Sequence, residues 1–277
     1  MRLGALAELV RAPAALSVPG DVVAGAGAAD VLDRRTAGLA CASVCLYWAG
    51  MAANDWADRD LDAVERPRRP IPSGRISAPA ALGVAGALTA AGLALAGAAG
   101  GRRALAVAGP LAAAVWAYDL KAKNTGAGPF AMAACRALDV LLGASTGRVA
   151  RALPAALTVG VHTYTVTALS RGEVAGTRPR VAAATLATTA AVALTTASGP
   201  ASTVLAADYA RRYATAQARV LTDPAAPRVR AAVGAGIMAL PALQGALTAR
   251  AGRPVAGILV AAAAPLGRRL ARWISPT

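Results

Sequence analysis

The sequence is poor in charged and aromatic residues. Charged residues make up 16% of its 277 positions and aromatic residues 4%, with a single Phe. An average soluble domain carries about 25% charged residues, so a soluble fold with a core of large side chains is disfavoured. Hydrophobic residues instead reach 56%. Ala, Leu, Val and Gly supply most of them, and such small residues let helices approach one another closely in a lipid bilayer.

Cysteine and histidine are also scarce. The three cysteines, Cys41, Cys45 and Cys135, lie within apolar stretches. Their spacing indicates neither a disulfide framework nor a zinc site. The single histidine, His162, lies in an apolar stretch as well. We interpret it as a hydrogen-bonded packing residue rather than a base, because buried polar groups in membrane helices find partners.

Acidic residues are outnumbered by basic ones, with 14 Asp and Glu against 29 Lys and Arg and a formal net charge of +15. A basic excess can indicate nucleic acid binding, but that function needs a basic face on a soluble fold. The basic residues here lie mostly between apolar segments, as they do in the cytoplasmic loops of membrane proteins. The charge pattern therefore predicts a lipid bilayer, and no nucleic acid, as a partner of this chain.

Apolar segments recur along the whole chain. A helix needs about 20 mostly apolar residues to cross a bilayer. The segments of suitable length are 12–32, 36–57, 77–99, 103–120, 127–147, 153–170, 180–198, 200–218, 229–249 and 253–270. The segment 200–218 is the weakest, because charged residues interrupt it. The pattern predicts an all-α, polytopic transmembrane helix bundle of eight to ten helices, in a single domain over residues 1–277.

The positions of Arg and Lys predict the orientation of the bundle. Positively charged residues resist translocation and collect in cytoplasmic loops. With the N-terminus inside, more of them fall on the inner side than on the outer side. We therefore expect a multi-pass protein of the cell membrane whose N-terminus and loops near 58–76, 119–126 and 171–180 are cytoplasmic.

The end of the second apolar segment carries a cluster of acids. Asn54, Asp58 and Asp62 follow one another at one-turn intervals, and Asp55 lies beside them. On a continuous helix these side chains share one face. Carboxylates placed so closely repel one another unless a cation lies between them, and oxygen ligands are those that Mg²⁺ prefers. The sequence therefore predicts a magnesium site here.

The acids of this segment allow two other interpretations. An acidic helix end is often merely solvated. A calcium-binding loop starting at Asp58 fails, because Ala63 replaces its turn glycine and Arg69 its bidentate glutamate. The basic segment that follows favours an anion-binding site, since Arg66, Arg68 and Arg69 can donate forked hydrogen bonds to phosphate oxygens. Prolines at positions 67, 70 and 72 keep this segment out of a helix.

At this point a family resemblance is visible. The pattern Asn-Asp-x-x-Asp-x-x-x-Asp followed by Arg-Pro-x-Arg-Pro-Ile-Pro-Ser-Gly resembles the first aspartate-rich motif of the UbiA superfamily of intramembrane prenyltransferases. The length and the helix pattern fit that family across nearly the whole chain. The resemblance implies about nine helices around a central cavity. It also implies Mg²⁺-dependent ionisation of a prenyl diphosphate and transfer of the prenyl group to an acceptor, often an aromatic one.

The resemblance assigns roles to residues of this chain. Asn54, Asp58 and Asp62 would hold Mg²⁺ against the diphosphate with support from Asp55, and they would be the catalytic residues together with Glu173. The side chains expected to bind substrate on the phosphate side are those of Arg66, Arg69, Tyr118, Lys123 and Arg171. The segment Tyr118 to Lys123 resembles the Tyr and Lys stretch of the family. Lys123 can also be read as an ordinary anchor of a helix end.

The second acidic motif departs from the family pattern. The region that corresponds to it reads Ser-Arg-Gly-Glu-Val-Ala-Gly over 170–176, with Glu173 as its one carboxylate and Arg171 beside it. Either Glu173 suffices with a water-rich Mg²⁺ shell, or the chemistry is altered. The alternative function is therefore a non-catalytic component that binds an isoprenoid diphosphate or exports a lipid.

Charged residues inside predicted spans are further candidates for the substrate pocket, because burying a charge in a bilayer is costly. These are Asp21, Arg136, Asp139 and Asp208. Arg136 and Asp139 can alternatively form a structural pair at i,i+3 on one helix. The acceptor stays an unidentified small molecule, because the sequence offers no aromatic cluster from which to argue its chemistry.

Overall fold

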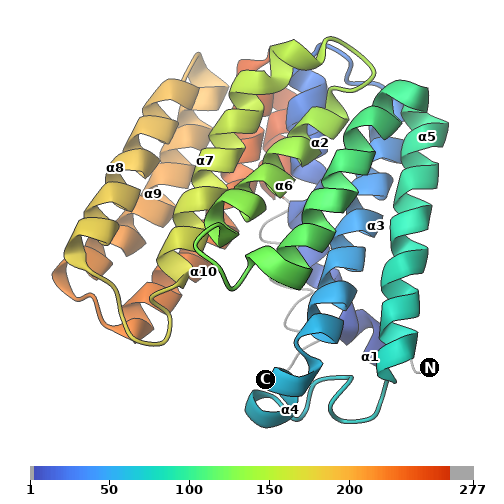
Figure 1. Cartoon of the computed structure of the whole chain (residues 1–277). Helices are drawn as coiled ribbons and strands as arrows, with labels where there is room; N and C mark the ends of the chain where they lie inside the picture. Colours follow the sequence, from blue (N-terminus) through green and yellow to red (C-terminus); the bar gives the residue numbers. More distant parts are fainter. Residues whose placement is uncertain (1–2, 263–277) are drawn as a thin grey trace.

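A computed structural model describes residues 3–262 of the chain, and within them all regular structure is helical (Figure 1). The bundle confirms the all-α fold class. Short helices that are not α-helical are labelled η. The elements are α1 Leu3–Leu9, η1 Ala12–Ser17, α2 Pro19–Ala28, α3 Arg34–Ala57, α4 Arg59–Glu65, α5 Ala78–Ala117, η2 Tyr118–Ala122, α6 Gly128–Gly143, η3 Val149–Ala152, α7 Leu153–Ser170, α8 Pro179–Thr196, α9 Pro200–Thr222 and α10 Ala226–Arg250.

The second predicted span is helix α3. A capping box starts it: the Asp33 side chain accepts from the backbone N–H of Arg35, and the Thr36 hydroxyl accepts from that of Asp33. These bonds satisfy donors that a helix start leaves free. Helix α3 packs along α5, where a Cβ added at Gly92 would lie 2.8 Å from Cγ of Leu46. A glycine therefore allows the two helices to approach closely.

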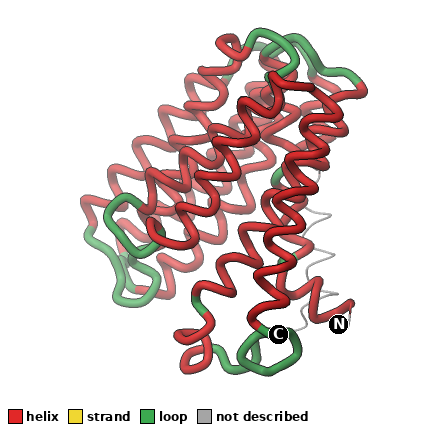
Figure 2. Tube along the Cα trace, turned by 45° about the vertical axis from the view of Figure 1, so that its right-hand side comes forward, coloured by secondary structure: helices red, strands yellow, loops and turns green. Residues whose placement is uncertain are grey.

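Helix α5 contains two antiparallel arms that correspond to the predicted spans 77–99 and 103–120. The chain reverses at Gly101, whose φ of 63° and ψ of −153° suit only glycine. The indole Nε1 of Trp116 on the second arm donates to Oγ1 of Thr89 on the first, over 3.1 Å. This bond joins the two arms side by side. Figure 2 shows the connecting loops, in green, gathered at the ends of the bundle.

The first predicted span, 12–32, was wrong as a single helix. Over this region the structure has the 3₁₀-helix η1 and then α2, and the short helix α1, which the prediction did not include, precedes them. Arg11 interrupts the chain in the left-handed conformation with φ 48°, and Pro19 begins α2 as its first residue. A proline has no backbone N–H and clashes with the preceding turn, which disfavours its place in a helix interior and suits it to the first turn, where Pro19 lies. Apolar composition alone does not indicate where a helix breaks.

The remaining predicted spans agree with α6 to α10. The weak segment 200–218 is a continuous helix, because its charges neutralise one another: Asp208 pairs with Arg211 at 2.9 Å and with Arg212 at 2.7 Å. The last segment, 253–270, is helical from 254 to 262, and its remainder lies outside the described residues.

Four helical stretches in the described part of the chain are long and apolar enough to cross a membrane. They are 34–57, 78–122, 149–170 and 226–250. The stretch 78–122 contains both arms of α5, and the other helices are shorter or more polar. These stretches cover five of the ten predicted spans, because 78–122 contains two of them.

The connections between helices gather at two ends of the bundle. At one end, Lys123 contacts Asp58, and the backbone N–H of Thr177 donates to the carbonyl of Pro224. Helix α4 lies at this end too, together with the α7–α8 and α9–α10 connections (Figure 1). At the other end, the Gly101 turn lies near Thr146, which a Cβ at Gly100 would contact at 3.2 Å.

Helices α2 and α6 touch through their main chains. A Cβ added at Gly25 would lie 1.8 Å from the carbonyl oxygen of Val140, and one at Gly143 would lie 2.0 Å from that of Val22. Glycine is required at both positions, since real Cβ atoms do not approach so closely. Such small-residue contacts are typical of helices that pack in membranes. They fix the separation of the two helices that carry Asp21 and Asp139.

Candidate functional site

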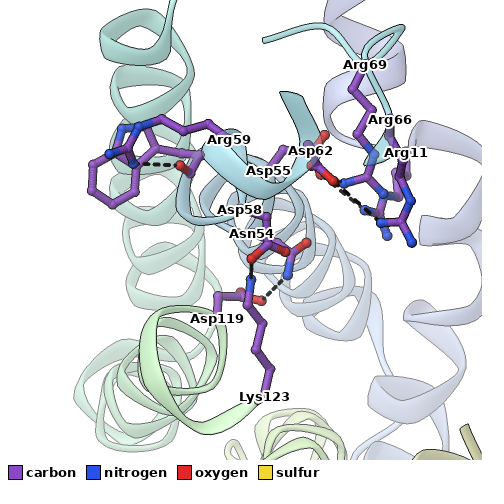
Figure 3. A network of polar contacts seen from close by, with 11 residues as sticks. Arg11, Asn54, Asp55, Asp58, Arg59, Asp62, Arg66, Arg69, Asp119 and Lys123 are labelled. Atoms are coloured by element: carbon purple, nitrogen blue, oxygen red, sulfur yellow. Dashed lines mark hydrogen bonds and ion pairs between the residues drawn. The ribbon is translucent and has the colours of Figure 1, made fainter. Parts of the chain in front are cut away.

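The acidic segment lies where α3 passes into α4. Asp58 joins the two helices, and the backbone stays nearly helical there, because the Asp58 N–H donates to the Asn54 carbonyl and the Asp62 N–H to the Asp58 carbonyl. Asn54 and Asp58 face the end of α5. Nδ2 of Asn54 donates to Oδ1 of Asp119 over 3.3 Å, and Nζ of Lys123 lies 2.7 Å from Oδ1 of Asp58 (Figure 3).

Asp55 and Asp62 form a second group on the neighbouring side of the helix (Figure 3). Nη1 of Arg69 donates to both carboxylates, at 3.1 Å to Asp55 and 2.6 Å to Asp62. Arg11 adds a bond of 3.1 Å to Asp55, and Arg66 lies 3.6 Å from Asp62. The expectation that Asp62 shares a face with Asn54 and Asp58 is therefore corrected. Asp55 and Asp62 are seven residues apart, and two helical turns bring them together.

The proline-rich segment after α4 holds Arg69 in place. The Ser73 backbone N–H and hydroxyl both donate to the Arg69 carbonyl, and the Ile76 N–H donates to the Pro70 carbonyl. Arg75 then binds both carboxylate oxygens of Glu8 on α1, at 2.5 and 3.0 Å. These turns fix the guanidinium that neutralises Asp55 and Asp62.

A π-helical turn, η2, presents Asp119 to the site. One-turn π-helices inside α-helical runs occur mostly at functional positions. Asp119 is 2% exposed, and Gly50 on α3 makes room for it. A Cβ added at Gly50 would lie 3.2 Å from Oδ2 of Asp119 and 2.7 Å from Cγ1 of Val115. Tyr118, expected to bind substrate, directly precedes it and lines the cavity described next.

A cavity of about 80 Å³ extends from Asp119 into the bundle between α3, the second arm of α5 and α6. Apolar side chains make up most of its wall. They come from α3, α5 and α6 and include Leu46, Met51, Leu111, Val115 and Met132. An apolar chamber beneath a cluster of acids and bases suits a ligand with one charged end and one hydrocarbon end.

The inner end of this cavity is polar. Nε of Arg136 pairs with Oδ2 of Asp21 at 2.9 Å, and Nε2 of Gln244 donates to the other oxygen of Asp21 at 2.6 Å. Asp139 instead accepts a bond of 2.8 Å from the Ser43 hydroxyl. The proposed i,i+3 pair between Arg136 and Asp139 is thus replaced by an interhelical pair, because Asp21 on α2 reaches the guanidinium.

The loop after α7 carries Arg171 and Glu173. Nη2 of Arg171 donates to the carbonyl of Thr125, which places this loop against the connection that follows Lys123. Nη1 of Arg230 binds the backbone carbonyl of Glu173 at 2.5 Å. Burial raises the pKa of the Glu173 carboxyl above its usual range, and the Arg230 guanidinium offsets part of that rise. In residues 3–262 no group of three or more acidic, His or Cys side chains is placed to hold a metal, so Glu173 does not join Asp58 and Asp119.

The donor set can nevertheless accommodate Mg²⁺. Asp58, Asp119 and the side-chain oxygen of Asn54 are hard oxygen ligands that meet at the cavity mouth, and the Lys123 ammonium already occupies a cationic position against Asp58. Mg²⁺ commonly uses one or two carboxylates and completes its shell with water and phosphate oxygens. Asp62 is a further candidate, because its Oδ1 has no hydrogen-bond partner within the described part of the chain.

Sequence reasoning missed two members of this site. Asp119 lies within the Tyr and Lys segment. Its position at a helix end, directly after Tyr118, is the feature of the sequence that could have indicated a role in the site. Arg11 gave no local signal, because its contact with Asp55 joins residues 44 positions apart. Pairings of this kind depend on the fold and not on spacing along the chain.

Comparison with known sequences places this site in context. The sequence model described as the UbiA prenyltransferase family matches residues 15–275. A digeranylgeranylglyceryl phosphate synthase of Ignicoccus hospitalis is 34% identical over 171 residues, which are 58% of this chain and 56% of that protein. A protein of the same name from Korarchaeum cryptofilum is 43% identical over 96 residues, 34% of each chain. The matched segments thus span between a third and just over half of these relatives.

Solved structures share the arrangement of helices over most of the chain. A UbiA homolog from Aeropyrum pernix K1 gives a TM-score of 0.67 at 21% identity and covers 89% of this chain and 97% of that one. A UbiA homolog from Archaeoglobus fulgidus bound to GPP and Mg²⁺ gives 0.57 at 15% identity, covering 93% and 99%. At these identities the likeness establishes the fold.

Proposed function

Because the chain belongs to the UbiA prenyltransferase family, we propose that it is a Mg²⁺-dependent enzyme that moves a prenyl group from a prenyl diphosphate to an acceptor within the membrane. One observation carries this proposal. Asn54, Asp58 and Asp119 meet Lys123 at the mouth of an apolar cavity. A diphosphate with its metal matches the charged mouth, and an isoprenoid chain matches the apolar wall.

The reaction divides between the two parts of the site. Ionisation breaks the bond between the allylic carbon and the diphosphate oxygen, and the electron pair leaves with that oxygen. Asn54, Asp58 and Asp119 would hold Mg²⁺, which would neutralise the departing charge. The acceptor then forms a bond to the allylic carbon and gives up a proton. Lys123, Arg66 and Arg69 would bind phosphate oxygens, where negative charge accumulates.

The paired acids near Arg69 support this assignment. Asp55 and Asp62 are buried and share one guanidinium, so Arg69 is held rigidly at the junction of α3 and α4. A donor held in advance loses little freedom when phosphate binds. The apolar wall would keep water from the allylic cation, which otherwise would be quenched.

The names of the relatives guide the choice of substrates. Several are digeranylgeranylglyceryl phosphate synthases, and a chlorophyll synthase of Arabidopsis thaliana is 37% identical over 83 residues. Geranylgeranyl diphosphate is therefore the donor to test first. Naming of these relatives as synthases also favours catalysis over the alternative of a non-catalytic isoprenoid-binding or lipid-export protein. The acceptor is a small molecule that these names do not identify for this chain.

The test compares two neighbouring aspartates. We expect Asp58→Asn to lower Mg²⁺-dependent release of pyrophosphate from labelled geranylgeranyl diphosphate by roughly 100-fold or more, because a ligand aimed at the leaving group is lost. Asp60→Asn is the matched control: its side chain is 88% exposed and pairs only with Arg59, at 3.5 Å. It should retain activity. Equal activity of the two variants would rule out the proposed role of Asp58.

A further inference from the structure

Resting on the proposed function, we infer that the inner end of the cavity binds the acceptor through a hydroxyl or amine group, which donates a hydrogen bond to Asp139. The same carboxylate would select against acceptors that carry their own carboxylate at that end. This assigns a chemical class to the unidentified acceptor and makes Asp139 a residue that determines specificity.

Asp139 has a free acceptor atom in a buried place. The residue is 4% exposed and lines the cavity on α6. Its Oδ2 accepts from the Ser43 hydroxyl at 2.8 Å, whereas its Oδ1 has no hydrogen-bond partner among residues 3–262. An unsatisfied buried oxygen of this kind is costly. A ligand with an O–H or N–H group would remove that cost.

The charges around Asp139 favour a donor over an anion. Arg136 is the nearest base on the same helix, and it is engaged by Asp21 at 2.9 Å and by the Ser17 carbonyl at 3.2 Å. Asp139 itself forms no ion pair within 4.0 Å in the described part of the chain. The cluster of Asp21, Arg136 and Asp139 therefore sets two carboxyl groups against one guanidinium. A second carboxylate placed there would be repelled in a medium of low dielectric constant.

The position of Asp139 separates this binding role from that of the metal. Its partner Ser43 precedes Asn54 on α3 by three turns, a distance of about 16 Å along the helix. A group bound at Asp139 therefore lies well inside the cavity, away from the acids at the mouth. Asp139 would hold one end of the acceptor, whose reacting end must extend back to the allylic carbon near the mouth, so Asp139 itself takes no part in ionising the donor.

A purely hydrocarbon occupant of the inner end explains this geometry less well. The walls nearer the mouth include Leu46 and Leu111, which suit an isoprenoid chain. At the inner end, the same chain would bury the free oxygen of Asp139 against carbon atoms and leave it unpaired. A polar acceptor group satisfies that oxygen, so the two ends of the cavity suit two different substrates.

The test measures binding of two probes of which only one carries an O–H donor at neutral pH, benzyl alcohol and benzoate. Each is titrated into the purified full-length protein, and the midpoint of thermal unfolding is followed. We expect the alcohol to bind the natural protein about ten-fold or more tightly than the carboxylate, as one hydrogen bond to a charged group would give. Equal binding, tighter binding of the carboxylate, or binding of neither probe would overturn the inference.

A variant makes the test specific. Asp139→Asn keeps the shape of the side chain but removes its charge and adds a donor, so the preference should reverse toward benzoate. Met132→Leu, an apolar change in the same cavity, should leave the preference unaltered. An Asp139→Asn protein that folds and discriminates as the natural one does would also refute the inference. Stabilisation by geranylgeranyl thiolodiphosphate with Mg²⁺ is measured separately, so failure of the proposed function is recognised independently.

Discussion

At the scale of single residues, the site depends on charges that are compensated in two separate groups. Arg69 lies between Asp55 and Asp62, and Lys123 lies against Asp58. Breaking a buried pair is more damaging than its net contribution suggests, since a lone charge is left behind. The arginine that serves two buried acids should therefore be the most sensitive basic residue of the proline-rich segment.

The position of Arg69 between two buried acids predicts the effect of Arg69→Gln. The change leaves Asp55 and Asp62 facing each other, with only Arg11 and the more distant Arg66 nearby, and we expect a loss of about 3 kcal/mol in the free energy of unfolding. Unfolding by denaturant in detergent measures it. Arg68→Gln, at an exposed neighbouring position, should cost less than about 0.5 kcal/mol. Similar losses in both variants would show that Arg69 is not a structural bridge.

Gly50 gives a second prediction at this scale. In Gly50→Ala the new methyl group would press on Oδ2 of Asp119 at 3.2 Å and on Val115 at 2.7 Å. We expect the Asp119 carboxylate to move, so that more Mg²⁺ is needed for half-maximal pyrophosphate release. Gly83→Ala, where a Cβ meets open space, is the matched control and should behave as the natural protein. An unchanged Mg²⁺ requirement in Gly50→Ala would count against Asp119 as a metal ligand.

At the scale of helices, the sequence predicts most elements but not their interruptions. Apolar length located α3 and α7 to within two residues of their observed ends. It joined η1 and α2 into one span, because hydropathy does not register the new helix that begins at Pro19, and it did not predict α1. The same holds for the site. The spacing of the acids in 54–62 predicts that they lie together, whereas their division into two groups depends on side chains that follow α1 and on η2.

The reversal within α5 can be tested directly. Gly101 adopts φ 63° and ψ −153°, a region that residues with a Cβ occupy at a cost of about 1–3 kcal/mol. Gly101→Ala should lower the free energy of unfolding by that amount, as measured by denaturation in detergent. Gly109→Ala lies on the second arm of α5 in open space and should not destabilise the protein. Equal stability of the two variants would mean that the turn tolerates a side chain.

At the scale of the whole molecule, basic residues are distributed unequally between the two ends of the bundle. The end with the site carries residues of α4, the proline-rich segment, η2 and the α7–α8 connection. These are Arg59, Arg66, Arg68, Arg69, Arg75, Lys121, Lys123, Arg171 and Arg178. The opposite end holds Arg34, Arg35, Arg102, Arg103, Arg148 and Arg151. Since positive residues favour the cytoplasmic side, we propose that the site opens to the cytoplasm.

Cysteine labelling would test this orientation. In a background with Cys41, Cys45 and Cys135 replaced by Ala, we expect Arg103→Cys at the Gly101 turn to react with a membrane-impermeant maleimide in intact cells. Val174→Cys, at a position that is 92% exposed in the α7–α8 loop, should react only after the membrane is permeabilised. The reverse pattern would place the site on the outer side.

The glycine contact between α2 and α6 has a consequence for how this protein can change its substrate. Gly25 and Gly143 let the two main chains touch, so the close approach of the two helix backbones sets the spacing between Asp21 and Asp139. Trimming neighbouring side chains cannot widen that part of the chamber. New acceptors would have to be accommodated by exchanging the polar groups themselves, which makes chemical preference easier to alter by mutation than the size of the molecule admitted.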